Sequence, residues 1–522
     1  MKIVTVAEMR EMDRRTIEDF KAPSRSLMER AGAGVAHSVA QFAELCGFAG
    51  GFVHLIAGRG NNGGDAFVAA RCLKDMGFGV EVWLAGSPAQ LTGDAAFFYS
   101  KLKTPKINTE ALDSVDEWEM AIRDPLYAEI IVDGVLGIGA MGPARGPAAG
   151  AIQYIRSQQD HALVVSIDVP SGLNADTGIA EGDAVFADVT VTIGLPKRGL
   201  VSAAARNHVG ALDVVDIGLP TEVMDQAGAS DIELIQPSDL RPAFSRRHRD
   251  THKGDYGHAL LIGGGGAYTG AMTLAARAAA RSGVGLVTAI VPQSLRTVLA
   301  SASPESMVAA APESEEGTLT EKAIDVIRSF YAPGRAVVIG PGLTRSPAAR
   351  ALVEFLVKEA PGPLLVDADA LVVAGGPESF ARAKHPVVLT PHPGEAAALL
   401  GCAVEEIQSD RIAAVRTLAK RSRAVVVLKG AGTLVAAPDD PKVWINCCGN
   451  PGMAKGGSGD VLSGFLGGFL AQGIAPLQAA CAAVYVHGIA GDFAALRRSQ
   501  LSITASDIIA ELSPAFNEIS AR

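Results

Sequence analysis

The residues best suited to chemistry lie between Gly449 and Gly464, where the chain reads GNPGMAKGGSGDVLSG. Five glycines fall between Gly449 and Gly459, and Asp460 stands where this loop is expected to become an apolar helix. Glycines let backbone N–H groups surround an anion, and a helix N-terminus adds the positive end of its dipole. We expect Asp460 to stay ionised and to take a proton from a hydroxyl group while a phosphate is transferred to it. The alternative, a flexible loop with a helix-capping aspartate, is disfavoured by the length and order of the motif.

A second glycine-rich segment, Gly58 to Asp65, reads GRGNNGGD and follows a short apolar run. Its glycines permit the close approach of a phosphate, and its two asparagines supply amide donors and carbonyl acceptors. Asn62, Asp133 and Ser171 carry oxygen atoms of the kind that bind a hard cation. The first half is therefore expected to hold a site of its own.

Asp168 is the best acid/base candidate of the first half, because it ends an apolar run and precedes a Val-Pro-Ser-Gly turn. The alternative is a structural aspartate that caps this turn. The segment Gly137 to Pro143, reading GIGAMGP, is expected to form a second flexible wall around a phosphate.

Short apolar runs that alternate with helical segments are expected to position these residues. Each run ends in a polar or glycine-rich segment, which is where an open α/β sheet places its ligands. A helix is expected from Ala66 to Met76, directly after GNNGGD. The alternation predicts a doubly wound parallel sheet in each half. The expected strands are 52–57, 79–85, 130–133, 163–167 and 189–193, then 258–262, 285–291, 336–339, 364–366, 386–389 and 424–428.

The alternation stops between about Met224 and Tyr256, in a segment that contains AGAS, QPSDLRP and the charged run SRRHRDTHKGD. We interpret this segment as a crossover between two domains, residues 1–225 and 226–522, because 522 residues exceed one ordinary core. Most of the charged run is a solvated linker in this interpretation. The alternative for its end, His252 to Tyr256, is that it covers a phosphate of a ligand.

Composition excludes several classes of protein. Hydrophobic residues make up 48% of the chain and charged residues 20%, which is typical of a globular protein. A net charge of −10 without a long basic block disfavours nucleic acid and acidic membranes as partners. Six scattered cysteines, with no CxxC pair, predict reduced thiols and no zinc site. The N-terminus has no apolar signal core and no stretch is convincing as a membrane span, so we expect a cytoplasmic protein.

The motifs together resemble a known family. GRGNNGGD, VDGVLG and DVPSG are similar to the NAD(P)H-hydrate epimerase domain of the YjeF N-terminal type. GPGL, DADAL, TPHPGE, KGAGT and NPGMAKGGSGD resemble the ADP- or ATP-dependent NAD(P)H-hydrate dehydratases, which have a ribokinase-like fold. Nearly the whole chain is covered in family order, so it resembles the fused, bifunctional NAD(P)H-hydrate repair enzymes. The fold class implied is α/β, with an N-terminal Rossmann-like three-layer sandwich and a C-terminal ribokinase-like three-layer sandwich.

The resemblance implies repair of hydrated NADH and NADPH, named NADHX and NADPHX. The first domain would interconvert their R and S epimers. The second would dehydrate the S epimer, with ADP as phosphoryl donor and Mg²⁺ as counter-charge, giving AMP and phosphate. A homo-oligomer is also expected.

The resemblance implies a set of site residues as well. The catalytic residues are Asp168 in the epimerase domain and Asp460 in the dehydratase domain. A potassium ion is implied at Asn62, Asp133 and Ser171. The epimerase substrate would meet Asn61, Asn62, Gly63, Gly64, Asp65, Gly137, Ile138, Gly139, Ala140, Met141, Gly142, Pro143 and Asp168. The dehydratase substrate would meet Ala271, Gly342, His392 and Asp460, and the nucleotide would meet Lys429, Gly430, Ala431, Gly432, Thr433 and Gly459.

Two alternatives from other classes stay open at this stage. The second half could be a vitamin or sugar kinase, because the same fold and an aspartate base serve those reactions too. The first half could be a non-catalytic nucleotide-binding or assembly module. Intact GNNGGD and Asp168 argue against that second alternative.

Overall fold

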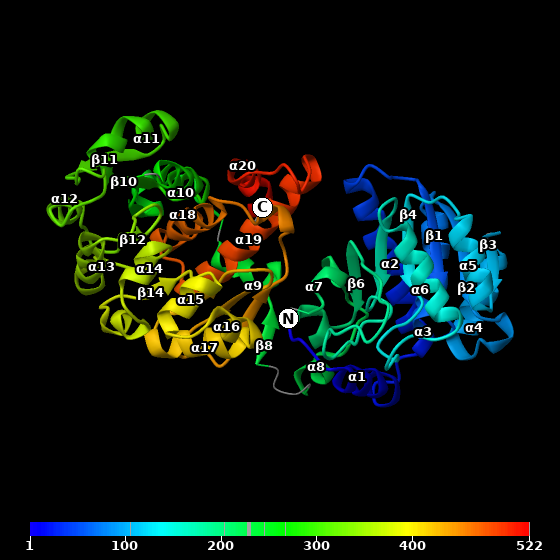
Figure 1. The fold of residues 1–522 in the computed structure, drawn as a ribbon. Coiled ribbons are helices and arrows are strands. Elements are labelled where there is room, and N and C mark those ends of the chain that lie inside the picture. The colour runs from blue at the N-terminus through cyan, green and yellow to red at the C-terminus, as the bar shows by residue number, and fades with distance from the viewer. Residues whose placement is uncertain (105, 203, 227–230, 245, 267, 521–522) are drawn as a thin grey trace. The chain divides into compact units, whose positions relative to one another are not determined.

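Two sheets organise the chain, one in each of two units, residues 1–230 and 231–522 (Figure 1). The computed structural model describes residues 1–522 except 105, 203, 227–230, 245, 267 and 521–522. The boundary predicted from the sequence stood at 225/226. The AGAS segment at 227–230 lies outside the described residues.

The sheet of the first unit has seven strands in the order β3-β2-β1-β4-β5-β6-β7, and every pair is parallel. Its order is that of a doubly wound dinucleotide-binding fold. The sequence did not suggest β3 or β7, which are the edge strands and carry more exposed residues than the central ones. The strands are β1 (Phe52–Ala57), β2 (Gly79–Ala85), β3 (Asn108–Leu112), β4 (Ile130–Gly134), β5 (Leu163–Ile167), β6 (Val189–Ile193) and β7 (Ala211–Val215).

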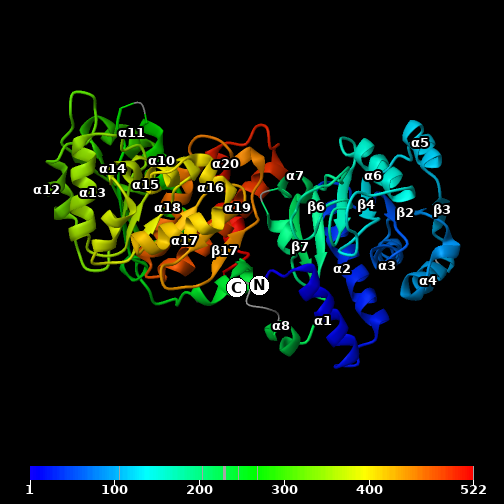
Figure 2. The same ribbon diagram turned by 60° about the horizontal axis from the view of Figure 1, so that its bottom comes forward.

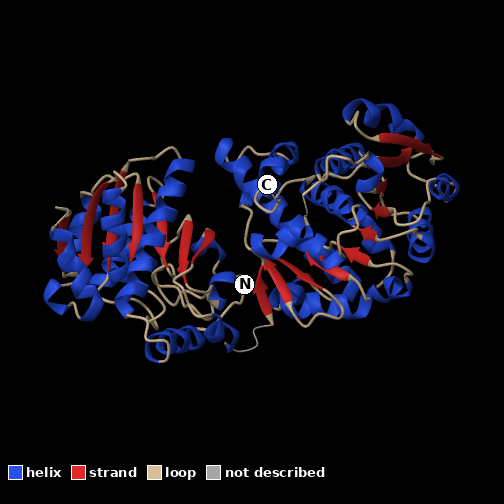
Figure 3. Cartoon of the chain, turned by 180° about the vertical axis from the view of Figure 1, so that it is seen from behind, coloured by secondary structure: helices blue, strands red, loops and turns tan. Residues whose placement is uncertain are grey.

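Helices cover both faces of this sheet (Figure 3). Leu55 packs into a core with α2 and α3, while its neighbour Ile56 packs into a core with α5 and α6. Adjacent residues of a strand point to opposite faces, so a strand buried on both sides reads as a continuous apolar run. The helices are α1 (Val6–Glu18), α2 (Ser24–Leu45), α3 (Asn61–Asp75), α4 (Gly93–Ser100), α5 (Val115–Arg123), α6 (Pro147–Gln158), α7 (Arg206–Val209) and α8 (Thr221–Gln226).

The second unit contains a ten-stranded sheet in the order β11-β10-β9-β12-β13-β14-β15-β16-β17-β8. In this order the strands from β11 to β15 pair in parallel, whereas β16 pairs antiparallel with both β15 and β17. The prediction of a wholly parallel sheet is therefore wrong for this unit. Strand β8 comes from the predicted crossover segment. The strands are β8 (Ile232–Leu234), β9 (His258–Ile262), β10 (Leu286–Pro292), β11 (Met307–Ala311), β12 (Ala336–Ile339), β13 (Leu364–Val366), β14 (Val387–Leu389), β15 (Val425–Leu428), β16 (Thr433–Ala436) and β17 (Val443–Asn446).

Helices also flank this second sheet (Figure 2). One face carries a core shared by α10, α18, α19 and α20. The helices are α9 (Pro237–Leu240), α10 (Thr269–Arg281), α11 (Arg296–Ala302), α12 (Ala323–Ser329), α13 (Pro347–Glu359), α14 (Asp369–Val373), α15 (Pro393–Leu400), α16 (Val404–Ser409), α17 (Arg411–Ser422), α18 (Ser458–Ala471), α19 (Pro476–Arg497) and α20 (Ala505–Phe516).

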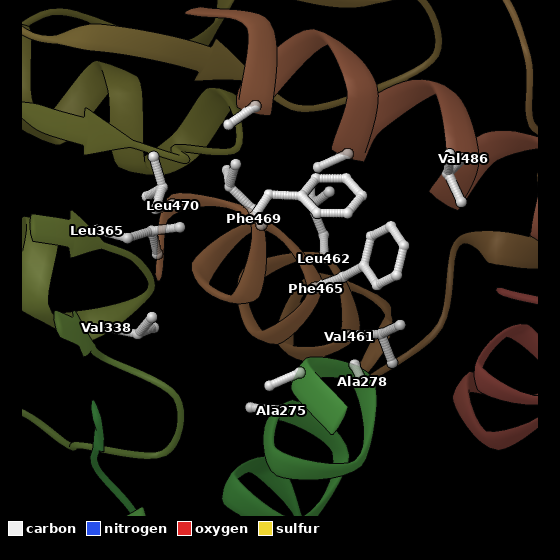
Figure 4. Close-up of a cluster of buried hydrophobic side chains, with 14 of the residues drawn as sticks. Ala275, Ala278, Val338, Leu365, Val461, Leu462, Phe465, Phe469, Leu470 and Val486 are labelled. Atoms are coloured by element: carbon white, nitrogen blue, oxygen red, sulfur yellow. The ribbon is translucent and has the colours of Figure 1, made fainter. Parts of the chain in front are cut away.

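Helix α18 is the centre of that core. Phe465 and Phe469 of α18 pack among side chains of the sheet and of neighbouring helices (Figure 4). Gly464 and Gly468 let α10 approach closely, because a Cβ atom at Gly464 would stand 2.0 Å from the carbonyl oxygen of Ala275. Helix α18 is therefore held firmly behind the loop that precedes it.

One described helix, α19, is long and apolar enough to cross a membrane by length and composition alone. In this structure 67% of its apolar window is buried inside the protein, as in the core helix of a globular domain. Its apolar surface is accounted for by the core that it shares with α18 and α20.

Candidate active sites

Asp460 lies in the first turn of α18, directly after the glycine-rich loop. Gly457 is the N-cap residue with φ = 94°, a conformation that favours glycine, and it has no side chain to cap the first-turn N–H groups. Among the described residues, the N–H groups of Gly456 and Gly457 have no hydrogen-bond acceptor. The loop thus presents free N–H groups beside Asp460, as an anion site requires.

Lys429 brings the KGAGT segment to this loop. A Cβ atom at Gly459 would stand 3.5 Å from Nζ of Lys429. The same Nζ lies 2.7 Å from Oδ1 of Asp367 and 3.7 Å from Oε2 of Glu395. The ends of β13, β14 and β15 therefore deliver one ammonium and two carboxyl groups next to the helix that carries Asp460.

The pKa values of the two aspartates in this cluster, Asp460 and Asp367, are shifted in opposite directions. Burial and the negative charge of Asp367 together raise the pKa of Asp460 to about 7, although the Lys429 ammonium opposes the rise. The pKa of Asp367 is lowered although burial opposes this, because Lys429 and hydrogen bonds from Lys429, Ser463 and Thr390 stabilise its carboxylate. Asp460, which the sequence predicts to stay ionised, is therefore protonated more readily than an ordinary aspartate. A pKa near 7 is well matched to a general base at neutral pH.

The loop before α18 is anchored at two points. The half-buried Asp492 accepts hydrogen bonds from the Gly449 N–H at 2.8 Å and from Nδ2 of Asn450 at 2.9 Å. Nζ of Lys455 donates to the carbonyl oxygen of Leu501 at 2.9 Å. These hydrogen bonds restrain the glycine-rich segment, whereas the alternative from the sequence was a flexible loop.

The KGAGT loop is braced by Arg411. Its guanidinium donates to the carbonyl oxygens of Leu428, Lys429 and Gly432, at 3.2 to 3.3 Å. Thr433 donates from Oγ1 to the carbonyl oxygen of Gly430 at 2.9 Å. Gly430, Ala431, Gly432 and Thr433 therefore form a tight turn, in which Gly430 and Ala431 are exposed, Thr433 is half-buried and Gly432 is buried.

Two of the residues predicted to meet the dehydratase substrate lie together, and a third, His392, has a structural role of its own. Gly342 and Ala271 lie together, because a Cβ atom at Gly342 would stand 3.2 Å from Cβ of Ala271. His392 caps α15, where its Nδ1 accepts the Gly394 N–H at 3.0 Å and the backbone N–H of His392 donates to Glu395 at 2.7 Å. His392 thus has a structural task, while its half-exposed ring leaves Nε2 3.4 Å from Glu395.

In the first unit, Asp168 follows β5 with φ = 66°, a left-handed conformation that is uncommon outside glycine. Strained residues of this kind are frequent at functional sites. Nζ of Lys197, whose side chain is 1% exposed, lies 2.5 Å from Oδ1 of Asp168. The ammonium also donates to Thr192 and to the carbonyl oxygen of Ile193. Asp168 is therefore half of a buried ion pair.

The predicted cation ligands Asn62, Asp133 and Ser171 do come together. Oγ of Ser171 donates to Asp133 Oδ1 at 2.6 Å, and Ser166 donates to Asp133 Oδ2 at 2.8 Å. Burial raises the pKa of Asp133, against the hydrogen bonds from Ser171. Nδ2 of Asn62 donates to the carbonyl oxygens of Leu136 and Ile167, and its buried Oδ1 has no hydrogen-bond partner among the described residues.

The GNNGGD segment differs from the prediction. It was expected to be a turn before a helix at Ala66, but α3 already begins at Asn61. A Cβ atom at Gly63 would stand 1.9 Å from the carbonyl oxygen of Gly58, so this glycine serves the packing of α3 against the end of β1. Asn61 is exposed, whereas Asn62, Gly63, Gly64 and Asp65 are buried.

The wall from Gly137 to Pro143 is partly open to solvent. Gly137 lies against Asn62, because a Cβ atom there would stand 3.3 Å from Cβ of Asn62. Ile138 and Ala140 are half-buried, and Gly139, Met141, Gly142 and Pro143 are exposed. The wall thus starts at the predicted cation ligands and runs to the surface.

Sequence analysis missed three groups that shape these sites. Lys197 follows β6 in the sequence GLPKRG, and a lysine beside a strand end with apolar neighbours was its only signal. Asp367 opens the DADAL motif, in which the sequence alone indicates no role for this residue. Ser463 lies one turn after Asp460 and donates to Oδ2 of Asp367.

Family comparisons cover both units. The family described as "NAD(P)H-hydrate dehydratase" matches residues 259–514, and the family described as "YjeF-related protein N-terminus" matches residues 24–199. The bifunctional NAD(P)H-hydrate repair enzyme of Moorella thermoacetica is 40% identical over 513 residues, which are 98% of this chain and 95% of that protein. The enzyme of the same description from Escherichia coli is 36% identical over 88% of this chain and 84% of its own length.

A solved structure resembles the second unit. It is the ADP/ATP-dependent NAD(P)H-hydrate dehydratase of Bacillus subtilis, co-crystallised with ATP and Mg²⁺. The sequences are 30% identical and the TM-score is 0.50, with 56% of this chain and 100% of that chain covered. The expected ribokinase-like fold of the second half is thereby confirmed.

Proposed function

Because the chain belongs to the family of bifunctional NAD(P)H-hydrate repair enzymes, we propose that Asp460 is the base of its dehydratase site and Asp168 an acid/base of its epimerase site. The chain is an NAD(P)H-hydrate epimerase and dehydratase like these relatives, and the family described as NAD(P)H-hydrate dehydratase matches its second unit. The observation that carries the dehydratase proposal is Asp460 beside free N–H groups and the Lys429 ammonium.

The chemistry follows from the substrate. Hydrated NADH carries a hydroxyl at C6 of the nicotinamide ring, next to N1, and hydroxide is a poor leaving group. Asp460 takes the hydroxyl proton while a phosphoryl group passes from ADP to the oxygen, which leaves AMP. The C6–O bond then breaks with electrons from N1, phosphate departs, and loss of a C5 proton restores NADH.

The chain's own groups suit each part of this reaction. The N–H groups of Gly456 and Gly457 would stabilise the negative charge on the transferred phosphoryl group. The Lys429 ammonium would lie near the phosphates, although Asp367 and Glu395 already balance part of its charge. Among the described residues no three acidic, His or Cys side chains gather to hold a metal, so Mg²⁺ would be held largely by the nucleotide.

In the first unit, Asp168 would assist the reversible loss and return of the C6 hydroxyl. Potassium fits the neighbouring cluster in one respect, since the buried Oδ1 of Asn62 lacks a partner. We propose that Asn62, Asp133 and Ser171 hold this ion, whose positive charge would fix the segments around the substrate. Both carboxylate oxygens of Asp133 already accept hydrogen bonds, so the ion would share them with Ser166 and Ser171.

The decisive experiment uses the pure protein and both epimers of NADHX, with and without ADP. Absorbance of regenerated NADH should rise only when ADP is present, and AMP should form in equal amount. Formation of NADH without any nucleotide would refute the proposal that ADP is the phosphoryl donor. A stable phosphorylated product in place of NADH would support the vitamin or sugar kinase alternative, and a lack of epimer exchange would support a non-catalytic first unit.

A further inference from the structure

Asp13 occupies an unexpected position on α1. The buried residues of this helix are Met9, Met12 and Thr16, and Asp13 falls within their i, i+3, i+4, i+7 spacing. Its carboxyl group is thus placed on the core-facing side, where an apolar residue would be expected. A charged group on a buried helix face is costly, so its presence calls for a partner or a function.

The segment that carries Asp13 is bonded to three parts of the epimerase site. Val4 accepts the Arg198 N–H at 2.8 Å and donates to the carbonyl oxygen of Pro196 at 2.9 Å, so it brackets Lys197. Arg10 donates to the carbonyl oxygen of Ile138 in the exposed wall at 3.2 Å. The Val6 N–H donates to Asp176, in the segment after Asp168, at 2.7 Å. This segment lies outside residues 24–199, which the family comparison matches.

Asp13 interacts with the ion pair at the centre of the site. Burial raises its pKa to about 6, with the Lys197 ammonium opposing the rise and the Asp168 carboxylate adding to it. Asp65 of GNNGGD belongs to the same group, and burial together with Asp168 and Asp13 raises its pKa well above the usual value. Three carboxyl groups therefore share one ammonium, and Lys197 neutralises only the one it contacts, Asp168.

We propose that Asp13 is a second catalytic acid/base of the epimerase unit and acts together with Asp168. This inference rests on the proposed function of the first unit. In one direction, the Asp13 carboxyl group gives its proton to the C6 hydroxyl as the C6–O bond breaks, N1 supplies the electron pair, and water departs. A water molecule then adds to the other face of C6 and gives its extra proton to the Asp168 carboxylate. Asp168 then releases this proton to solvent and Asp13 takes one up from solvent, so both groups return to their starting states. The reverse epimerisation uses the two groups in exchanged roles.

The test compares Asp13→Asn with Glu11→Gln in the full-length protein. Glu11 lies on the same helix but is exposed and paired with Arg14. Loss of one acid/base group is expected to slow epimer exchange by about 10²–10⁴-fold in Asp13→Asn. Exchange in Glu11→Gln, and ADP-dependent dehydration of the S epimer in both variants, should stay as in the wild type.

A second readout separates chemistry from folding. Exchange of the C6 oxygen with heavy-oxygen water should fall in Asp13→Asn in parallel with epimer exchange, while Asp13→Glu should restore part of both. Fluorescence of Trp83 and Trp118, which are buried in the first unit, should show that the fold is kept. Wild-type exchange rates in Asp13→Asn would overturn the inference and leave the proposed function standing. Absence of exchange in the wild type would instead overturn the proposed function.

Discussion

The hydroxyl oxygen of Ser463 lies 2.5 Å from Oδ2 of Asp367, and this hydrogen bond ties α18 to the end of β13. Oδ1 of the same carboxylate pairs with Nζ of Lys429 at 2.7 Å. Asp367 therefore holds both the helix that carries Asp460 and the cation beside it. The geometry of the dehydratase site depends on a buried residue that need not touch the substrate.

Ser463→Ala should destabilise the second unit. Removing a hydrogen bond to a buried carboxylate leaves an acceptor unsatisfied, which costs about 1–3 kcal/mol of unfolding free energy. Denaturant unfolding of the full-length protein measures this, and Ser329→Ala on the exposed side of α12 is the matched control. An unchanged unfolding free energy in Ser463→Ala would mean that Asp367 is held by Lys429 and Thr390 alone.

The dehydratase rate should depend on pH through Asp460. A base must be deprotonated to act. The value of kcat/KM should therefore rise as the pH increases through about 7, the pKa of Asp460 in the protein without substrate. The Lys429 ammonium lowers this pKa, so Lys429→Met should move the rising limb to higher pH. The exposed Lys420→Met on α17 is the control and should leave the profile unchanged. A limb that stays in place in Lys429→Met would show that another group governs the profile.

Asp460→Asn and Asp168→Asn should separate the two activities. General-base loss costs about 10²–10⁴-fold in rate, so Asp460→Asn should stop ADP-dependent NADH formation and keep epimer exchange. Asp168→Asn should convert the S epimer in a fast phase with the amplitude of the S fraction, followed by a slow tail.

Loss of both activities in Asp460→Asn with the fold intact would refute two separate sites. A single fast phase through both epimers in Asp168→Asn would exclude Asp168 as the epimerase acid/base. Because Lys197 loses its charged partner in this variant, thermal unfolding should be followed in parallel.

Potassium should matter for one activity only. Replacing it with a large organic cation should slow epimerisation, because such an ion cannot reach the buried Oδ1 of Asn62, and should spare dehydration of the S epimer. Asn62→Ala should abolish the potassium dependence of epimerisation, whereas a variant of the exposed Asn61 should keep it. Equal epimerisation rates in both salts would argue against an ion at Asn62, Asp133 and Ser171.

The sequence by itself determined the alternating architecture and the places where chemistry is expected. Strands such as Phe52–Ala57 and His258–Ile262 were predictable to the residue, because strands buried on both faces appear as short apolar runs. Asp168 and Asp460 were predictable as candidates, because parallel strands and helix starts present polar residues at one edge of a sheet. The edge strands β3 and β7 could not be predicted from the sequence, because their exposed residues break the apolar pattern.

Only the tertiary structure decided what surrounds those aspartates. Lys197 is 29 residues from Asp168 in the sequence, and Ser463 is 96 residues from Asp367. The side chains of each pair nevertheless form a direct hydrogen bond. A pKa depends on burial and on nearby charges, both of which arise when distant segments pack together. For that reason the raised pKa of Asp460 and the core-facing carboxyl of Asp13 could not be predicted from local sequence patterns.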